Sequence, residues 1–117
     1  MAADQNDSGR KERSMKKYTA KNVTCRLNED GTIGYWYYTS HIVHLSPEAV
    51  TVNTCGHNTI STRRHINNIM LFYGIDLRLF NRNHRLHIRR GSRVDGGSSH
   101  WYFPLTPAET RMILADE

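Results

Sequence analysis

The apolar positions after Asn53 change from the alternation of a strand to the three- and four-residue spacing of a helix, and this change is the clearest structural signal in the chain. The spacing predicts a helix over about residues 62–73 with one face against a core. Ser61 or Thr62 could cap its start, and Gly74 could adopt the left-handed conformation after its end. The apolar stripe consists of Thr62, Ile66, Ile69, Met70 and Tyr73.

Before this helix, residues 17–28 predict an extended segment that leads through the Asp30-Gly31 turn into an aromatic strand over residues 32–39. Aromatic side chains occupy both faces of this second strand. Three arrangements would explain this pattern: the strand is buried on both faces, it forms an exposed platform on which nucleic-acid bases stack, or it forms the interface of a homodimer. The candidate stacking residues are Tyr35, Trp36, Tyr37 and Tyr38.

Two hairpins are predicted, one on each side of the helix. In the first, Leu45 faces Val50 around a proline turn, which puts His41 on the apolar side and Ile42 on the other. The second places a four-residue loop at 81–84, and its apolar side carries leucines and an isoleucine. Its outward pairs are then Phe80 with Arg85, Arg78 with His87, and Asp76 with Arg89.

The end of the chain predicts a flexible loop over residues 90–99 and a short strand over 100–103. Thr106 and Glu109 form a capping box around Pro107, which predicts a helix over about 107–114 that docks through Ala108, Met112 and Ile113. The predicted fold is therefore α+β: an antiparallel sheet of about five to six strands, with the main helix on one face and this short C-terminal helix. Residues 1–16 are predicted to be a disordered polar tail, and 17–117 a single domain.

The composition is that of a small polar chain, with 117 residues, a net charge of +5 and a mean hydropathy of −0.66. No run approaches the roughly 20 apolar residues that span a bilayer, and no apolar stretch of a secretory signal follows the basic N-terminus. We therefore expect a cytoplasmic protein without a membrane partner. In a reducing compartment, Cys25 and Cys55 are expected to be free thiols that pack like small apolar side chains.

Arginine is concentrated between residues 63 and 93, where eight arginines accompany one acidic residue, Asp76. Such a block sets a positive field that favours anionic partners, although arginines also occur as the solvated face of a sheet or helix. The hairpin pattern displays several of them together. The candidate nucleic-acid contacts are Arg63, Arg64, Arg78, Arg82, Arg85, Arg89, Arg90 and Arg93.

The sequence contains no strong motif for a catalytic or metal-binding site. Cys55 with His57, and His84 with His87, could contribute to a zinc site, but their spacing does not suit a closed set of four ligands. No nucleophilic triad, phosphate-binding loop or carboxylate pair is present, so we expect no enzyme, no cofactor and no metal. The turn before the helix combines hydroxyl groups, helix amides and arginines, which either attract an anion or only cap the helix.

The run YYTSHIVHLSPEAVTVNTCGHNTISTRRHIN, about residues 37–67, combines a strand, a VTVNTCG turn, a TIST segment and a basic helix. It resembles the core of small uncharacterised bacteriophage accessory proteins, in which these parts read T-x-I/V, V-T-L-N-[ST]-G-G, T-x-[ST]-T and a basic helix ending in I/M-N. Cys55 stands in place of the first glycine of the pair, and His57 in place of an aromatic residue. The resemblance implies a bacteriophage protein acting in the cytoplasm of the host bacterium, and it implies no activity.

Three functional hypotheses follow from these features. The first is a non-enzymatic protein that binds DNA or RNA through an arginine-rich face. The second is a phage inhibitor that docks on an acidic surface of a host enzyme or defence complex, anchored by exposed apolar residues such as Leu71 and Phe80. The third is a metal-binding domain that uses cysteine and histidine ligands.

Overall fold

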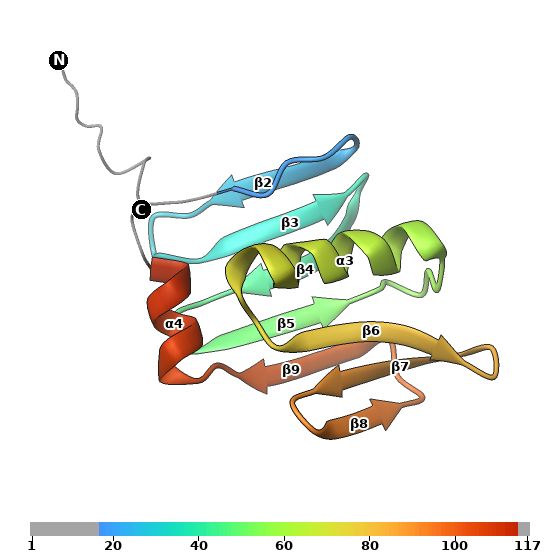
Figure 1. Ribbon diagram of the computed structural model, residues 1–117. Coiled ribbons are helices and arrows are strands. Elements are labelled where there is room, and N and C mark those ends of the chain that lie inside the picture. The colour runs from blue at the N-terminus through green and yellow to red at the C-terminus, as the bar shows by residue number, and fades with distance from the viewer. Residues whose placement is uncertain (1–16, 115–117) are drawn as a thin grey trace, which may run out of the picture.

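The structure, a computed structural model, describes residues 17–114, and the predicted disordered tail of residues 1–16 lies outside the described residues (Figure 1). Within that range the chain forms a five-stranded antiparallel sheet, a separate three-stranded antiparallel sheet and two helices. The predicted α+β class is confirmed, but the second hairpin belongs to a sheet of its own. The large sheet has the order β2 (Val23–Leu27), β3 (Ile33–Tyr37), β4 (Ser40–Leu45), β5 (Ala49–Asn53) and β9 (His100–Pro104). The small sheet has the order β6 (Leu77–Arg82), β7 (Arg85–Arg90) and β8 (Arg93–Gly96), and the helices are α3 (Ile60–Tyr73) and α4 (Pro107–Leu114).

Helix α3 presents the predicted apolar stripe to the core, and every residue of that stripe is buried. The helix begins at Ile60, earlier than predicted, because the side chain of Thr59 caps it and accepts a hydrogen bond from the Thr62 amide at 3.2 Å. The prediction that Ser61 or Thr62 caps the helix is therefore wrong. Gly74, with a φ of 71°, ends the helix in the left-handed conformation as predicted.

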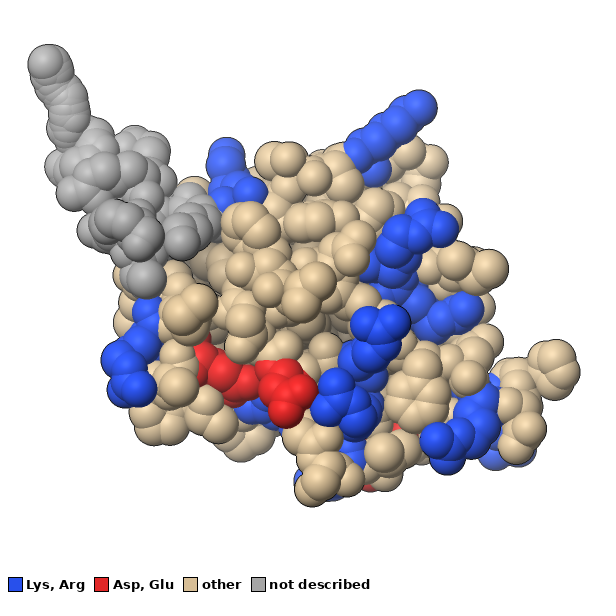
Figure 2. All heavy atoms as spheres, in the orientation of Figure 1, with Lys and Arg blue, Asp and Glu red and all other residues tan. Residues whose placement is uncertain are grey.

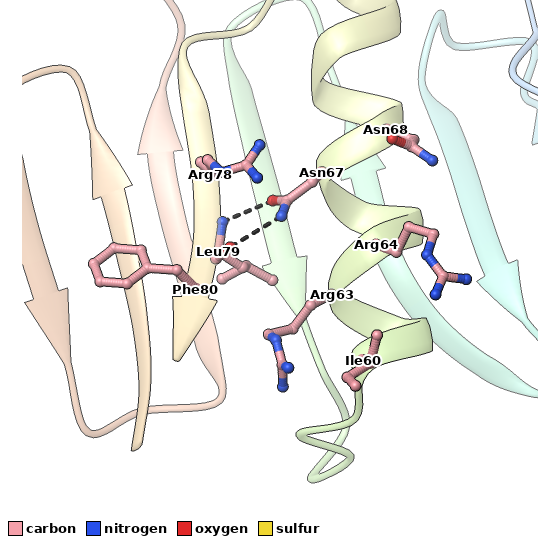
Figure 3. Close-up of a pocket in the computed structure, with 8 residues that line it drawn as sticks. All are labelled: Ile60, Arg63, Arg64, Asn67, Asn68, Arg78, Leu79 and Phe80. Carbon is pink, nitrogen blue, oxygen red and sulfur yellow. Dashed lines mark hydrogen bonds between the residues drawn. The ribbon is translucent and has the colours of Figure 1, made fainter. Parts of the chain in front are cut away.

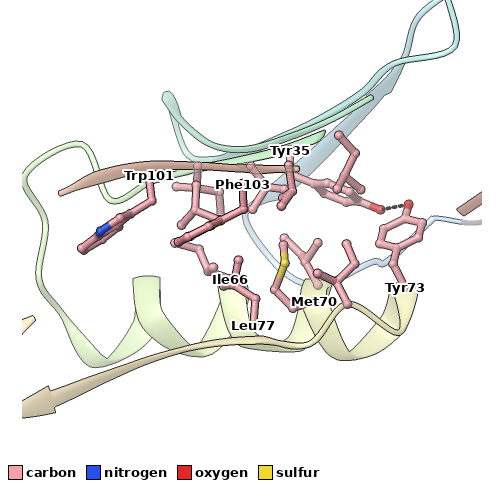
Figure 4. Close-up of a cluster of buried hydrophobic side chains, with 14 of the residues drawn as sticks. Tyr35, Ile66, Met70, Tyr73, Leu77, Trp101 and Phe103 are labelled. Carbon is pink, nitrogen blue, oxygen red and sulfur yellow. Dashed lines mark hydrogen bonds between the residues drawn. The ribbon is translucent and has the colours of Figure 1, made fainter. Parts of the chain in front are cut away.

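The core lies between the large sheet on one side and α3 with the small sheet on the other (Figures 1 and 4). Trp101 and Phe103 of β9 face Leu77 of β6 and Ile66 of α3 across this layer. The apolar face of the small sheet completes the core, because its inward leucines and isoleucine are all buried. These residues are Leu77, Leu79, Leu86 and Ile88.

A β-bulge in β4 corrects the predicted orientation of two side chains. Tyr35 pairs with Val43 but Trp36 pairs with His41, so Ile42 is the extra residue of β4. Both Ile42 and Val43 are buried, and His41 is exposed on the face away from α3. The predicted placement of His41 on the apolar side and of Ile42 on the opposite side is wrong, although the pairing of Leu45 with Val50 is confirmed.

The β6–β7 hairpin has a register two residues away from the predicted one, with Leu79 opposite Ile88 instead of Leu86. Asn83 and His84 alone form its turn, with φ values of 54° and 63°. Both central residues at positive φ are the signature of a type I′ turn, which matches the twist of the flanking strands. Because the shift is by two, the outward face keeps its predicted members, but the cross-strand pairs become Arg78 with Arg89, Phe80 with His87, and Arg82 with Arg85.

Replacing His84 in this turn by glycine should stabilise the protein. His84 occupies a left-handed backbone position that costs a side-chain-bearing residue about 1–2 kcal/mol, and glycine adopts it without strain. After allowing for the greater freedom of glycine in the unfolded chain, we expect His84→Gly to stabilise the protein by about 0.5–1 kcal/mol in urea unfolding. Asn81→Gly, within β6, should instead destabilise it. A variant His84→Gly that is less stable than the original chain would contradict the turn assignment.

Two predictions at the end of the chain need correction. The segment 90–99 is not only a flexible loop, because β8 forms within it and pairs with β7. The capping box of α4 is confirmed: the Glu109 amide donates to Thr106 Oγ1 and the Thr106 amide donates to Glu109 Oε1. Of the apolar residues expected to dock α4, only Ile113 is buried, while Ala108 and Met112 are exposed.

The described helices are short. No helix between residues 17 and 114 is long and apolar enough to cross a membrane.

Candidate nucleic-acid interface

A groove runs between helix α3 and the edge strand β6 (Figure 3). Its main hollow has a volume of about 320 Å³, and a second hollow of about 180 Å³ shares Asn67, Asn68 and Arg78 with it and extends it toward the start of β6. The main hollow is lined by Ile60, Arg63, Arg64, Asn67, Asn68, Arg78, Leu79 and Phe80.

Asn67 fixes the distance between the two walls of the groove. Its side-chain amide donates to the Leu79 carbonyl at 2.9 Å, and its Oδ1 accepts from the Leu79 amide at 2.7 Å (Figure 3). The side chain thus satisfies an outward-facing backbone pair of β6, in the place where a further strand would bind. The groove is therefore held on both sides by regular secondary structure, which positions the side chains along it.

The main hollow carries three arginines, and no acidic residue lines it. The side chains of Arg64 and Arg78 are exposed and make no hydrogen bond or ion pair within residues 17–114. Arg63 donates to the carbonyl and the side-chain oxygen of Asn58, at 3.2 and 2.7 Å, and both acceptors are neutral. No carboxylate among residues 17–114 therefore neutralises the three arginines of the main hollow. Arg63 and Arg64 also lie at the helix end where the macrodipole is positive.

The outward face of the small sheet continues the positive charge beyond the groove. Arg82 and Arg85 are directly opposite each other across β6 and β7, an arrangement in which like charges repel. Both are exposed, and neither has a carboxylate partner in the described part of the chain. Figure 2 shows these basic side chains gathered over the start of α3 and the small sheet, whereas the acidic atoms on this side lie near α4 and the start of β6. We call Arg63, Arg64, Arg78, Arg82 and Arg85 the basic surface.

The other three predicted contact arginines are engaged by acids of the protein. Arg89 lies 3.1 Å from Asp76, and Arg93 lies 3.2 Å from Asp95. Arg90 faces the core side of β7, opposite Leu77, and makes a two-pronged ion pair with Glu109 at 2.6 Å for each contact. The hydrogen bonds of Arg90 hold the pKa of the Glu109 carboxyl at about 2, well below its usual range. Arg90 is therefore a structural residue, which corrects its assignment as a phosphate contact.

The four predicted stacking residues do not form one platform. Tyr35 is fully buried and its hydroxyl lies 2.7 Å from that of Tyr73, so it cannot face a base, and burial raises its pKa. Tyr37 is half-buried beside His65. Trp36 points to the face of the large sheet away from α3, where it stacks on His41 with ring centroids 4.2 Å apart. Tyr38 alone is largely exposed, and it lies in the turn after β3.

Phe80 and His87 form an aromatic pair on the basic surface that sequence analysis did not predict. Their ring centroids lie 5.5 Å apart, with an angle of 19° between the ring planes. The guanidinium carbon of Arg82 lies 5.3 Å from the centre of the Phe80 ring. The alternation of β6 already placed Phe80 between two arginines, but its pairing with His87 depends on the register that the two-residue turn sets.

The other candidate sites are the turn before α3 and the cysteine and histidine residues. In the turn before α3, the amide of Thr62 is satisfied by the cap residue Thr59, which agrees with a role in capping. Cys55 is exposed at a φ of 55°, contrary to the predicted packing, whereas Cys25 is half-buried, and burial raises the pKa of its thiol. No group of three or more histidine, cysteine or acidic residues among residues 17–114 has an arrangement that could hold a metal ion.

The chain matches no protein-family model, no curated protein and no solved structure at a significant level. The resemblance to bacteriophage accessory proteins therefore stays a prediction.

Proposed function

We propose that this protein is a small non-enzymatic protein that binds nucleic acid through its basic surface. One observation carries the proposal: five arginines from α3, β6 and β7 lie on one side of the molecule with no carboxylate partner within residues 17–114. Two of them, Arg82 and Arg85, repel each other across the hairpin, and a phosphate between them would remove that repulsion.

The chemistry of the groove suits a phosphate backbone. Guanidinium groups bind phosphate oxygens through paired, charge-assisted hydrogen bonds. Arg63 on α3 and Arg78 on β6 belong to opposite walls of the groove, and Arg64 extends from α3 on the side away from β6 (Figure 3).

Asn68 also lines the main hollow, but it is half-buried and its amide nitrogen donates to the Tyr18 hydroxyl at 3.4 Å. Its side chain leaves α3 on the side away from β6 (Figure 3). Asn67 is not free to bind a phosphate, because both ends of its amide bind the backbone of β6.

Salt dependence tests this proposal. If all five arginines contact phosphates, the slope of log affinity against log salt concentration should be about −3.5 for a single strand and about −4.5 for a duplex. Affinity for a single strand should therefore fall by roughly a hundredfold between about 50 and 200 mM salt. Fluorescence anisotropy with labelled oligonucleotides measures both quantities. No binding of DNA or RNA at low salt, or binding independent of salt, would overturn the proposal.

A protein partner is the second candidate function, and exposed apolar side chains on α3 favour it. Ile60 is 66% exposed at the start of the helix and Leu71 is 80% exposed near its end, on either side of the arginines. Apolar anchors surrounded by charge are typical of interfaces, here with an acidic surface such as that of a host enzyme or defence complex. Affinity purification with and without nuclease separates the candidates, because a protein partner survives nuclease and a nucleic-acid complex does not.

A further inference from the structure

The aromatic pair lies flat on the outward face of the small sheet. Phe80 extends away from α3 across the sheet, with its ring seen nearly face-on in Figure 3. The neighbouring His87 ring lies over β8 at Gly96, where an added Cβ would come within 2.7 Å of the His87 Cδ2 atom and 3.0 Å of its Nε2 atom. Since Gly96 pairs with His87 across the strands, the missing side chain leaves the space that the ring occupies.

Arginines flank this pair along the strand direction. Arg78 lies two residues before Phe80, and Arg82 lies two residues after it on the same face. At about 3.3 Å of rise per residue, the two arginines are roughly 13 Å apart along the strand, with the ring midway between them. Arg85 lies opposite Arg82 and doubles the charge at that end. The face therefore places a cation on either side of a ring, and in a nucleic-acid strand each base is attached to a sugar that has a phosphate on either side.

We propose that the aromatic pair of Phe80 and His87 binds a base of single-stranded nucleic acid while Arg78, Arg82 and Arg85 hold the adjoining phosphates. This inference rests on the proposed function and names its substrate class. Arg82 lies over Phe80 in the free protein, and its exposed guanidinium moves to a phosphate when a base takes its place on the ring. A duplex does not supply this ligand, because its bases are stacked on one another and their faces are closed.

Three probes separate the contribution of the base to binding affinity from that of the phosphates. The first is a labelled thymidine oligonucleotide of about twelve nucleotides, the second is an abasic strand of the same length, and the third is a mixed-sequence duplex. The abasic strand carries the same phosphates without any base. We expect the full chain to bind the thymidine strand about tenfold more tightly than the abasic strand, because stacking of one base on an aromatic ring has an effect of that size.

Two variants test the aromatic pair, with one matched control. Phe80→Leu should lower affinity for the thymidine strand to that for the abasic strand, and leave the abasic affinity unchanged. Gly96→Ala should act in the same direction by several-fold, because its Cβ displaces the His87 ring. Tyr102→Leu removes a ring that is 66% exposed on the large sheet, outside the basic surface, and should change neither affinity. Circular dichroism and thermal unfolding establish that each variant is folded.

The outcomes distinguish this inference from the proposed function. Equal affinity for the thymidine and abasic strands, no effect of Phe80→Leu, or tighter binding of the duplex would overturn the single-strand inference and leave phosphate binding in place. An effect of Tyr102→Leu as large as that of Phe80→Leu would overturn it as well. Failure to bind any of the three probes at low salt would overturn the proposed function itself. Should Phe80→Leu not fold, the comparison of probes on the unmodified chain and the Gly96→Ala variant decide the question.

Discussion

Replacement of Glu109 by Gln is expected to destabilise the protein by about 3–5 kcal/mol at neutral pH, the cost of removing one partner from a buried ion pair. The Glu109 side chain is 8% exposed and accepts four hydrogen bonds. Each carboxylate oxygen accepts from one guanidinium nitrogen of Arg90 and from one backbone amide, of Thr106 or Asp76. A glutamine must place its amide nitrogen against two of these donors, whichever way it is oriented. Urea unfolding measures the loss.

The pH dependence of unfolding adds a second test of this ion pair. The folded pKa of Glu109, about 2, lies below its ordinary value of 4.5, so the stabilisation is present above the ordinary value and is lost as pH falls toward 2. At 1.36 kcal/mol per pH unit, the stability difference between the original chain and Glu109→Gln should shrink by about 3 kcal/mol over that window. Glu48→Gln removes an exposed carboxylate and is the control. A difference that is constant with pH would contradict the role of the charge.

Features that depend on neighbours in sequence were the predictable part of this fold. The apolar stripe of α3, the glycine that ends it and the capping box of α4 each depend on residues a few positions apart in the sequence. The bulge at Ile42 could not be predicted in this way, because it is defined by the strand opposite it. The turn at Asn83 and His84 uses positive φ without any glycine, so the usual turn signal is missing, and the hairpin register was wrong by two residues.

The basic surface was predictable as a group of residues but not as a set of contacts. Charge density located it, and alternation along β6 and β7 gave the outward face correctly, since a shift of two preserves the faces. The identity of the neutralised arginines depends on tertiary contacts such as that of Arg90 with Glu109, 19 residues away. The aromatic pair required the correct register, because Phe80 meets His87 only when the turn has two residues.

The largest expected effect on binding comes from replacing arginines of the basic surface whose side chains have no partner within residues 17–114. The side chains of Arg64, Arg78 and Arg85 are exposed and make no hydrogen bond or ion pair within residues 17–114, so replacing them removes no such contact. Converting all three to Gln should lower affinity for a single strand at low salt by at least about a hundredfold, since each charge-assisted contact is worth roughly 1.5–3 kcal/mol. The salt slope should become less steep by about 2 units. Anisotropy titrations at several salt concentrations measure both.

A charge-matched control separates the basic surface from net charge alone. Arg26 lies over Trp36, Arg93 pairs with Asp95, and Arg111 is exposed on α4, so none of the three belongs to the basic surface. Converting them to Gln removes the same total charge and should change affinity by less than about threefold, the residual effect of a weaker overall field at moderate ionic strength. If both triple variants weaken binding equally, nucleic acid is attracted by the charge of the whole chain and the basic surface has no special role. A large loss confined to the Arg64, Arg78 and Arg85 variant places the bound strand at this face, because salt screens charges that lie more than about 10 Å from the ligand.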